Sequence, residues 1–119
     1  METVHVRLRI RKREDSAEMA EEDFVLDTGI PYAIAPEKLV RGLGIAPTGE
    51  ERFFAGDDTH VRQTGDAYFE LGERSGCSKV VFGQEGDMNL VGVRTLEALG
   101  LFLHPFTREL MPLVATTAP

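Results

Sequence analysis

The sequence contains a single cysteine, Cys77, so no intrachain disulfide can form and cysteine pairs cannot build a zinc site. It also has no apolar run of about eighteen residues, the length that a membrane-spanning helix requires. The N-terminus lacks the apolar core of a signal peptide. We therefore expect a cytoplasmic protein that has no membrane partner and folds by packing alone.

Positive charge is scarce. The chain of 119 residues carries 13 Lys and Arg against 20 Asp and Glu, a formal net charge of −7. Proteins that bind nucleic acids usually concentrate Lys and Arg on one face. The basic cluster at residues 7–13 is followed at once by a series of acids between residues 14 and 23. The composition therefore predicts no nucleic-acid partner.

Several catalytic and ligand-binding motifs are also missing. The sequence has no phosphate-binding loop of the GxxxxGK[ST] type and no GxSxG nucleophile motif. His5, His60 and His104 are far apart and show no metal-ligand spacing, so we interpret each as a surface or strand histidine. Cys77 is interpreted as a small buried or half-buried strand residue rather than a nucleophile. We predict no metal and no cofactor.

The apolar pattern indicates many short strands in a single domain that spans residues 1–119. Residues 4–10 alternate between apolar and polar side chains, which is typical of a strand with one solvated face. The polar segment 11–23 is expected to be a loop. Pro36 and the glycines after it predict about two helical turns, and Leu96 and Leu99 share one face of a more convincing helix that Gly100 can end. Further strand-like runs occupy residues 24–26, 51–54, 59–72, 78–83, 89–93 and the segments after residue 100. The fold class predicted is all-β.

Asp27 differs from the other acids because it ends the apolar run 24–26. An acid in this place is expected to be partly desolvated. Thr28 supplies a hydroxyl and Gly29 permits a tight turn. Asp and Gly are also common in ordinary turns, so the triplet by itself leaves a turn and a catalytic site equally open.

The order of four features resembles the retropepsin family of aspartic proteases, and above all the small prokaryotic members of that clan. These features are the DTG triplet at 27–29, a hairpin followed by strands at 53–83, the LVG triplet at 90–92 and the helix at 94–100. The resemblance covers residues 4–112. It implies a closed all-β acid-protease barrel with a flap, meaning a hairpin that closes over the substrate, and one short C-terminal helix. It also implies a homodimeric aspartic endopeptidase that cleaves a peptide or protein substrate.

The resemblance assigns the candidate residues. Asp27, Thr28 and Gly29 would be catalytic: Asp27 of two subunits would share a proton and activate water, Thr28 would hydrogen-bond across the dimer, and Gly29 would let the substrate approach closely. The flap would comprise residues 53–60. The residues expected to bind substrate are Ile30, Ala55, Gly56, Asp57, Asp58 and Val91.

The sequence departs from the family in three places. Pro31 and Val93 stand where retroviral members pair an acid with an arginine, and Ile30 is larger than the usual residue. The flap tip, with Asp57 and Asp58, is acidic, and we favour a solvated turn over an effect on acidic substrates. The tail at about 113–119 is expected to be frayed or to contribute to the dimer.

Two other interpretations of the same residues stay open. The domain could be a catalytically inactive module for dimerisation or peptide binding, in which Asp27 is a structural acid. It could also be a β-domain unrelated to proteases, in which case Asp27 would face no two-fold axis.

Overall fold

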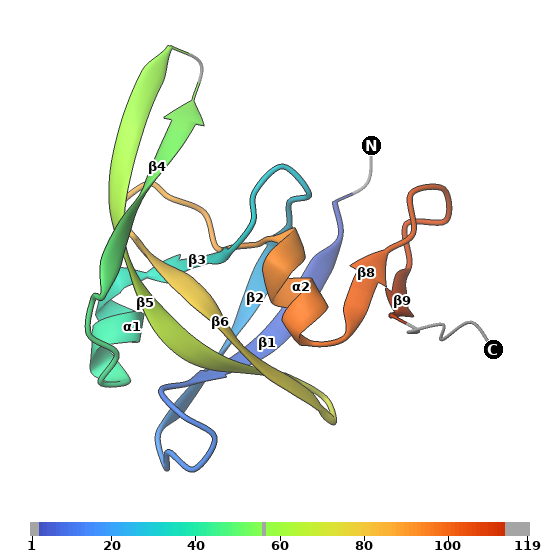
Figure 1. Cartoon of the computed structure of the whole chain (residues 1–119), viewed down its shortest axis with the longest axis horizontal. Helices are drawn as coiled ribbons and strands as arrows, with labels where there is room; N and C mark the ends of the chain where they lie inside the picture. The colour runs from blue at the N-terminus through green and yellow to red at the C-terminus, as the bar shows by residue number, and fades with distance from the viewer. Residues whose placement is uncertain (1–2, 56, 114–119) are drawn as a thin grey trace, which may run out of the picture.

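The protein is mostly β, with two short helices (Figure 1). The structure, a computed structural model, describes residues 3–55 and 57–113, and only the backbone of Ala55. Its elements are β1 (His5–Arg11), β2 (Met19–Leu26), β3 (Ala33–Pro36), α1 (Glu37–Gly42), β4 (Gly49–Ala55), β5 (Asp58–Leu71), β6 (Arg74–Gly83), β7 (Leu90–Val91), α2 (Val93–Ala98), β8 (Leu101–Leu103) and β9 (Leu110–Pro112).

The larger sheet has seven strands in the order β1-β2-β7-β3-β6-β5-β4. The pairs β2–β7 and β3–β6 are parallel, and the other pairs are antiparallel. Because β1 pairs with β5 as well as with β2, the pairings return to their starting point. The hairpin of β4 and β5 extends beyond this circuit, and β8 and β9 form a separate small sheet on the far side of α2 (Figure 1).

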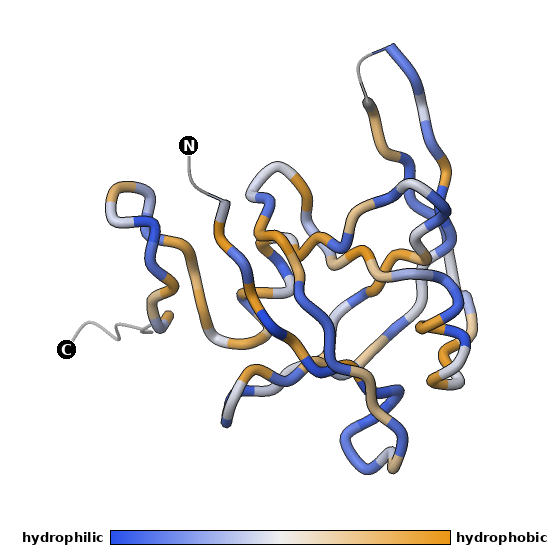
Figure 2. The backbone as a smooth tube through the Cα atoms, turned by 180° about the vertical axis from the view of Figure 1, so that it is seen from behind, coloured by the Kyte–Doolittle hydropathy of each residue, from blue (hydrophilic) through white to orange (hydrophobic). Residues whose placement is uncertain are grey.

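The core is one cluster of buried apolar side chains, most of them from the strands of the larger sheet. Val6, Leu8 and Ile10 are buried in β1 while their neighbours are exposed or half-buried, as the alternating sequence predicted. Phe24, Phe69 and Phe82 are the largest fully buried side chains, and they come from β2, β5 and β6. Hydrophobic and hydrophilic segments alternate along the backbone, and the connection between β1 and β2 is mostly hydrophilic (Figure 2). Burial of these aromatic and aliphatic groups is the main stabilising contribution.

The prediction of a loop at 11–23 is wrong for about half of these residues. β2 begins at Met19, which pairs with Arg11, so only residues 12–18 connect the strands. Cross-strand ion pairs explain why so polar a segment is a strand: Arg7 bonds Glu21 at 2.9 Å and Asp23 at 3.1 Å. Glu21 and Asp23 lie on the exposed face of β2, where opposite charges across a strand pair are mildly stabilising.

Two further expectations change. The run predicted at 59–72 is confirmed as β5, but β6 has 10 residues and begins at Arg74, four positions before the strand predicted at 78–83. Cys77 lies in β6 as a strand residue but is exposed, not buried. The two helical turns predicted after Pro36 are confirmed as α1, and the second helix is confirmed as α2. No helix in the described ranges is long and apolar enough to cross a membrane.

Candidate active site

Asp27 is fixed at the end of β2 by its neighbour β7. Leu26 pairs with Val91 in the parallel register of these strands, and the Asp27 amide donates a hydrogen bond to the Val91 carbonyl at 3.0 Å. The Val25 amide likewise donates to Asn89 at 2.9 Å. The apolar residues before Asp27 are therefore anchored in the sheet, and the carboxylate emerges where the sheet ends. The residue is half-buried.

A tight turn shapes the triplet itself. The Gly29 amide donates to Oδ1 of Asp27 at 2.8 Å, and the Ile30 amide lies 3.4 Å from the Asp27 carbonyl. A Cβ at position 29 would lie 3.1 Å from that same Oδ1. Glycine has no Cβ, so it leaves room for the carboxylate. The side chain–backbone bond is the Asx turn that Asp and Gly favour.

The loop after Asp27 rests on the beginning of α2. The Val93 amide donates to the Ile30 carbonyl at 3.1 Å and the Arg94 amide to the Pro31 carbonyl at 2.8 Å. These are amides of the first helical turn, which have no partner inside the helix. Gly92 makes the contact possible, because a Cβ there would overlap the Ile30 carbonyl oxygen and lie 2.5 Å from the Pro31 carbonyl carbon. The LVG triplet thus supports the DTG loop by hydrogen bonding and by close packing.

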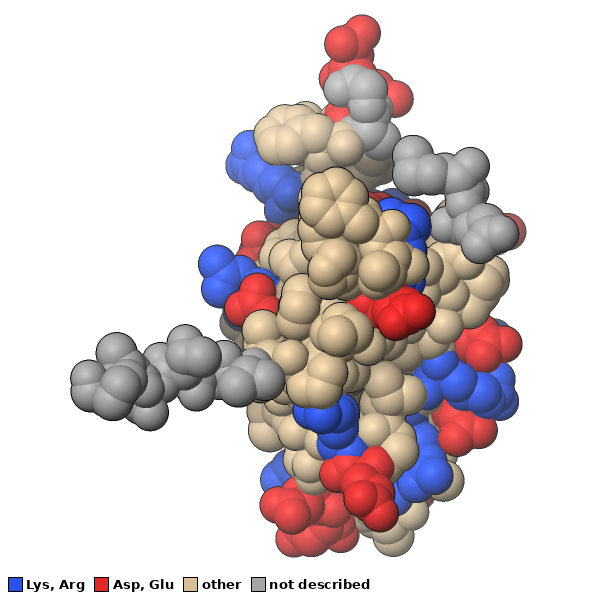
Figure 3. All heavy atoms as spheres, turned by 90° about the vertical axis from the view of Figure 1, so that its right-hand side faces the viewer, with Lys and Arg blue, Asp and Glu red and all other residues tan. Residues whose placement is uncertain are grey.

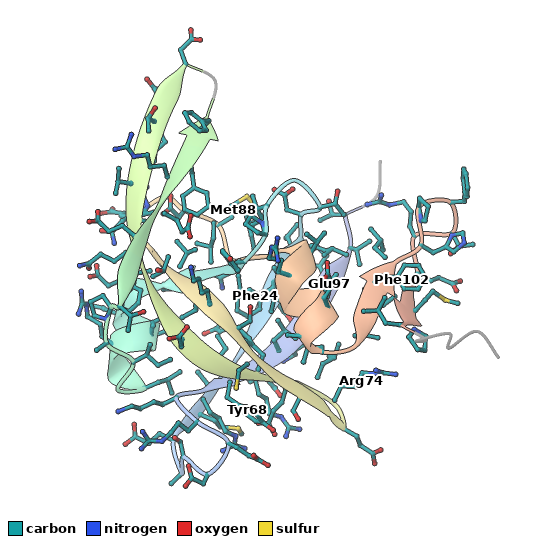
Figure 4. All side chains as sticks on the ribbon, viewed as in Figure 1. Phe24, Tyr68, Arg74, Met88, Glu97 and Phe102 are labelled. Carbon is teal, nitrogen blue, oxygen red and sulfur yellow. The ribbon has the colours of Figure 1, made fainter. Side chains whose placement is uncertain are left out.

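The hairpin of β4 and β5 faces this loop across two adjoining hollows. One, of about 290 Å³, lies between residues 29–32 of the loop and residues 51–54 of β4. The other, of about 260 Å³, shares Ile30, Phe53 and Phe54 with the first and continues toward β5 and the β6–β7 connection. Met88, which is 61% exposed, lies between the hairpin and the loop after β2 (Figure 4). A trough with mostly apolar walls therefore runs between hairpin and loop.

Ion pairs lie at both ends of the trough. Arg62 of β5 contacts Asp87 through two hydrogen bonds, of 2.8 and 3.1 Å. The Arg62 hydrogen bond is the largest cause that lowers the pKa of Asp87 below its ordinary value, and the Gln84 amide adds to the effect. At the other end, Lys79 lies 3.4 Å from Glu51 and over the ring of Tyr32. These pairs join the hairpin to the body of the domain.

Three of the residues predicted from sequence come together, since Asp27, Gly29 and Ile30 occupy one loop and the last two line the trough. Thr28 is exposed and lines a different hollow, of about 150 Å³, with α2 and β8. Val91 is fully buried, which argues against contact between its side chain and a peptide. Its carbonyl instead holds Asp27.

The predicted flap residues lie at the end of the hairpin. Asp57 and Asp58 are exposed there and line neither hollow of the trough. Gly56 and the side chain of Ala55 fall outside the described part of the chain. The predicted position of the hairpin tip therefore agrees with the strand bounds, while contact of the tip with substrate stays a prediction.

Several residues of the trough were not singled out from the sequence. Phe53 and Phe54 were included only as part of the flap, although Phe54 is 79% exposed, and an exposed aromatic next to a predicted turn is a usable signal. Arg62 and Asp87 are 25 positions apart and gave no local pattern. Only the pairing of β5 with β6 brings them together.

Across residues 3–55 and 57–113 no group of three His, Cys, Asp or Glu side chains is arranged to hold a metal ion. In comparisons with known proteins, no family model matches the chain and no curated protein sequence matches it.

Proposed function

We propose that the chain is a homodimeric aspartic endopeptidase with a retropepsin-like barrel, in which Asp27 and Asp27 of the partner subunit activate a water molecule. The observation that carries the proposal is the position of Asp27. It is fixed by β7 and Gly29, and its loop faces the hairpin across an apolar trough. The circuit of strand pairings supports the barrel, and the projecting hairpin supports a flap.

The chemistry needs two carboxyl groups. The ionised member of the pair takes a proton from a bound water, whose oxygen attacks the carbonyl carbon of the peptide. The protonated member gives its proton to the carbonyl oxygen. When the C–N bond then breaks, a proton passes to the leaving nitrogen. Two adjacent carboxyl groups cannot both ionise easily, so they share one proton and titrate as a unit.

The second copy is required because one chain offers one such triplet. A two-fold axis beside Asp27 would bring two loops together through the same surface on each subunit. Seen from the side of β8 and β9, uncharged side chains cover the middle of the molecule and charged ones lie mainly toward its edges (Figure 3). The exposed apolar residues of this region are Phe102, Phe106, Met111 and Leu113. The hollow that Thr28 lines lies between this region and the Asp27 loop.

A second candidate is a catalytically inactive module that binds peptides or dimerises. It is favoured by the trough itself, whose apolar walls could hold an extended peptide whatever the state of Asp27. In that case Asp27 serves only to close its own turn through the Gly29 amide.

The experiment compares the wild-type protein with Asp27→Asn. Asparagine keeps an oxygen for the Gly29 amide and removes the ionisable group. Cleavage of a mixed peptide library between about pH 3 and pH 7 should fall at least about a hundredfold in the variant. Sedimentation at several concentrations should give a dimeric mass. Equal activity of the two proteins, or two equally inert proteins, would refute the peptidase, and a monomer at every concentration would refute the shared site.

A further inference from the structure

The hollow of about 260 Å³, which continues toward β5 and the β6–β7 connection, has one polar side. The opposite walls are apolar and come from the DTG loop, β3, the hairpin and the segment before α2. These apolar residues are Ile30, Ile34, Phe53, Phe54, Met88 and Leu90. The polar side consists of His60, Arg62 and Asp87. The nature of a ligand that enters this hollow therefore depends on the charges that Arg62 and Asp87 present beside His60.

Arg62 and Asp87 neutralise each other. Nε of Arg62 donates to Oδ2 of Asp87 at 2.8 Å and Nη2 donates to Oδ1 at 3.1 Å, so the contact is bidentate. Asp87 is exposed as a whole residue, but its side chain retains only 26% of its accessible surface, and that of Arg62 retains 18%. Within the hollow the two charges act as one neutral, partly desolvated unit.

The pair is also held rigidly in place. The Gln84 amide donates to Oδ2 of Asp87 at 2.8 Å, and the Asp87 amide donates back to the Gln84 carbonyl at 2.9 Å. Arg62 is fixed on the other side, because its Nη1 donates to the Val61 carbonyl at 3.1 Å. Both oxygens of the carboxylate thus accept hydrogen bonds, and the charge of each ion is compensated by the other.

We propose that Arg62 and Asp87 determine the specificity of this hollow: as a mutually neutralised pair they make it select an apolar peptide side chain and reject charged ones. The inference rests on one part of the proposed function, namely that a peptide binds in the trough. A charged side chain entering the hollow would lose its hydration, and the two full charges on the polar side, Arg62 and Asp87, already compensate each other. An apolar side chain would gain contact with the aliphatic and aromatic walls, in a volume of about 260 Å³.

The same geometry predicts what happens when one partner is removed. Without Arg62, the Asp87 carboxylate is an uncompensated negative charge beside the apolar walls, and it should attract a basic side chain. Without the Asp87 charge, Arg62 should attract an acidic one. Removal of both charges should restore the preference for an apolar side chain, because the hollow is neutral again.

The test measures binding separately from cleavage. Fluorescein-labelled octapeptides that differ only in one central residue, Phe, Lys or Glu, are titrated in the Asp27→Asn background and followed by anisotropy. The parent should prefer Phe. Addition of Arg62→Gln should raise the affinity for the Lys peptide relative to the Phe peptide by about tenfold. Addition of Asp87→Asn should raise the affinity for the Glu peptide relative to the Phe peptide by a similar factor. The double variant should rank the peptides as the parent does.

Two controls keep the result interpretable. Arg13→Gln removes an exposed arginine in the β1–β2 connection and should leave the ranking unchanged. Near-ultraviolet circular dichroism and thermal unfolding report whether each variant keeps its fold. If single variants lose stability, the exchanged pair Arg62→Asp with Asp87→Arg should restore it together with the apolar preference.

The outcomes separate this inference from the peptidase. Shifts in ranking as described support it even where the wild-type protein cleaves nothing, since the trough then binds peptides without hydrolysing them. An unchanged ranking in the single variants, or no peptide binding at all, overturns the inference. Cleavage that depends on Asp27 would leave the proposed function standing in either case.

Discussion

At the scale of single residues, Gly92 is the position on which the Asp27 loop depends most directly. Its backbone is extended, with φ −97° and ψ 176°, so alanine could adopt the same conformation. The added Cβ, however, would meet the carbonyls of Ile30 and Pro31. Gly92→Ala should therefore push this loop away from α2 and cost about 1–3 kcal/mol in the free energy of unfolding. Urea unfolding and peptidase assays would measure both effects.

Gly42→Ala is the matched control. Gly42 ends α1, has no positive φ, and a Cβ there would meet nothing within 4 Å. Alanine is the better helix former, so this variant should be as stable as the wild type or slightly more stable. If Gly92→Ala unfolded at the same urea concentration as Gly42→Ala, the close packing of the loop would be refuted.

The turn at residues 27–29 could be predicted from sequence because the interaction that forms it joins neighbouring residues. The Asx turn between Asp27 and Gly29 follows from two adjacent side-chain properties, and it forms as expected. The burial of Val91 could not be predicted, since β7 becomes an interior strand of the sheet only when β2 and β3 pair with its two edges. The exposure of Cys77 likewise depends on which face of β6 the fold turns outward.

At the scale of elements, the contact between Arg62 and Asp87 joins the hairpin strand β5 to the β6–β7 connection and makes stability depend on pH. The pKa of Asp87 is lowered in the folded protein, first by the hydrogen bond from Arg62, from an ordinary value of 3.8. The unfolded chain therefore binds a proton more readily than the folded one. The contribution of this carboxylate is fully present above about pH 4 and is lost as the pH falls through the lowered folded value.

Asp87→Asn should therefore be less stable than the wild type at neutral pH by no more than about 1 kcal/mol, since the pair is partly exposed. The difference should shrink as the pH falls below about 4. Chemical unfolding at pH 7, 5, 4 and 3 would measure it. Glu14→Gln, a change to an exposed acid in the β1–β2 connection, serves as the reference. A difference that stayed constant down to pH 3 would contradict the assignment.

The elements themselves were predictable wherever the hydrophobic period was clear. β1, the hairpin and α2 were all expected, because alternation and helical spacing are visible over a few residues. The first half of β2 was not predicted because a run of charged residues is typical of a loop. It is held by backbone pairing with β1, with a smaller contribution from cross-strand ion pairs such as that of Arg7 and Glu21, 14 positions apart. Local patterns do not contain such partners.

At the scale of the whole molecule, the proposed site exists only in a dimer, so its activity should follow mass action. Phe106, in the β8–β9 connection, is 89% exposed and belongs to the apolar region assigned to the partner subunit. In Phe106→Asp, a charge in that surface would have to lose its hydration on association. Sedimentation should show a shift toward monomer. Activity per subunit should fall at low protein concentration and recover at high concentration, because the Asp27 loop itself is unchanged.

Met19→Asp is the control that shows whether association depends specifically on the surface around β8 and β9. Met19 is also an exposed apolar residue, 47% accessible, but it begins β2 at the end of the molecule that carries the β1–β2 connection. The same loss of apolar surface and gain of charge there should leave both mass and activity unaltered. If the two variants behaved alike, the surface around β8 and β9 would have no special part in association. If only Phe106→Asp dissociated while keeping its thermal unfolding temperature, the defect would lie in association rather than folding, and loss of activity would follow from separating the two Asp27 carboxyl groups.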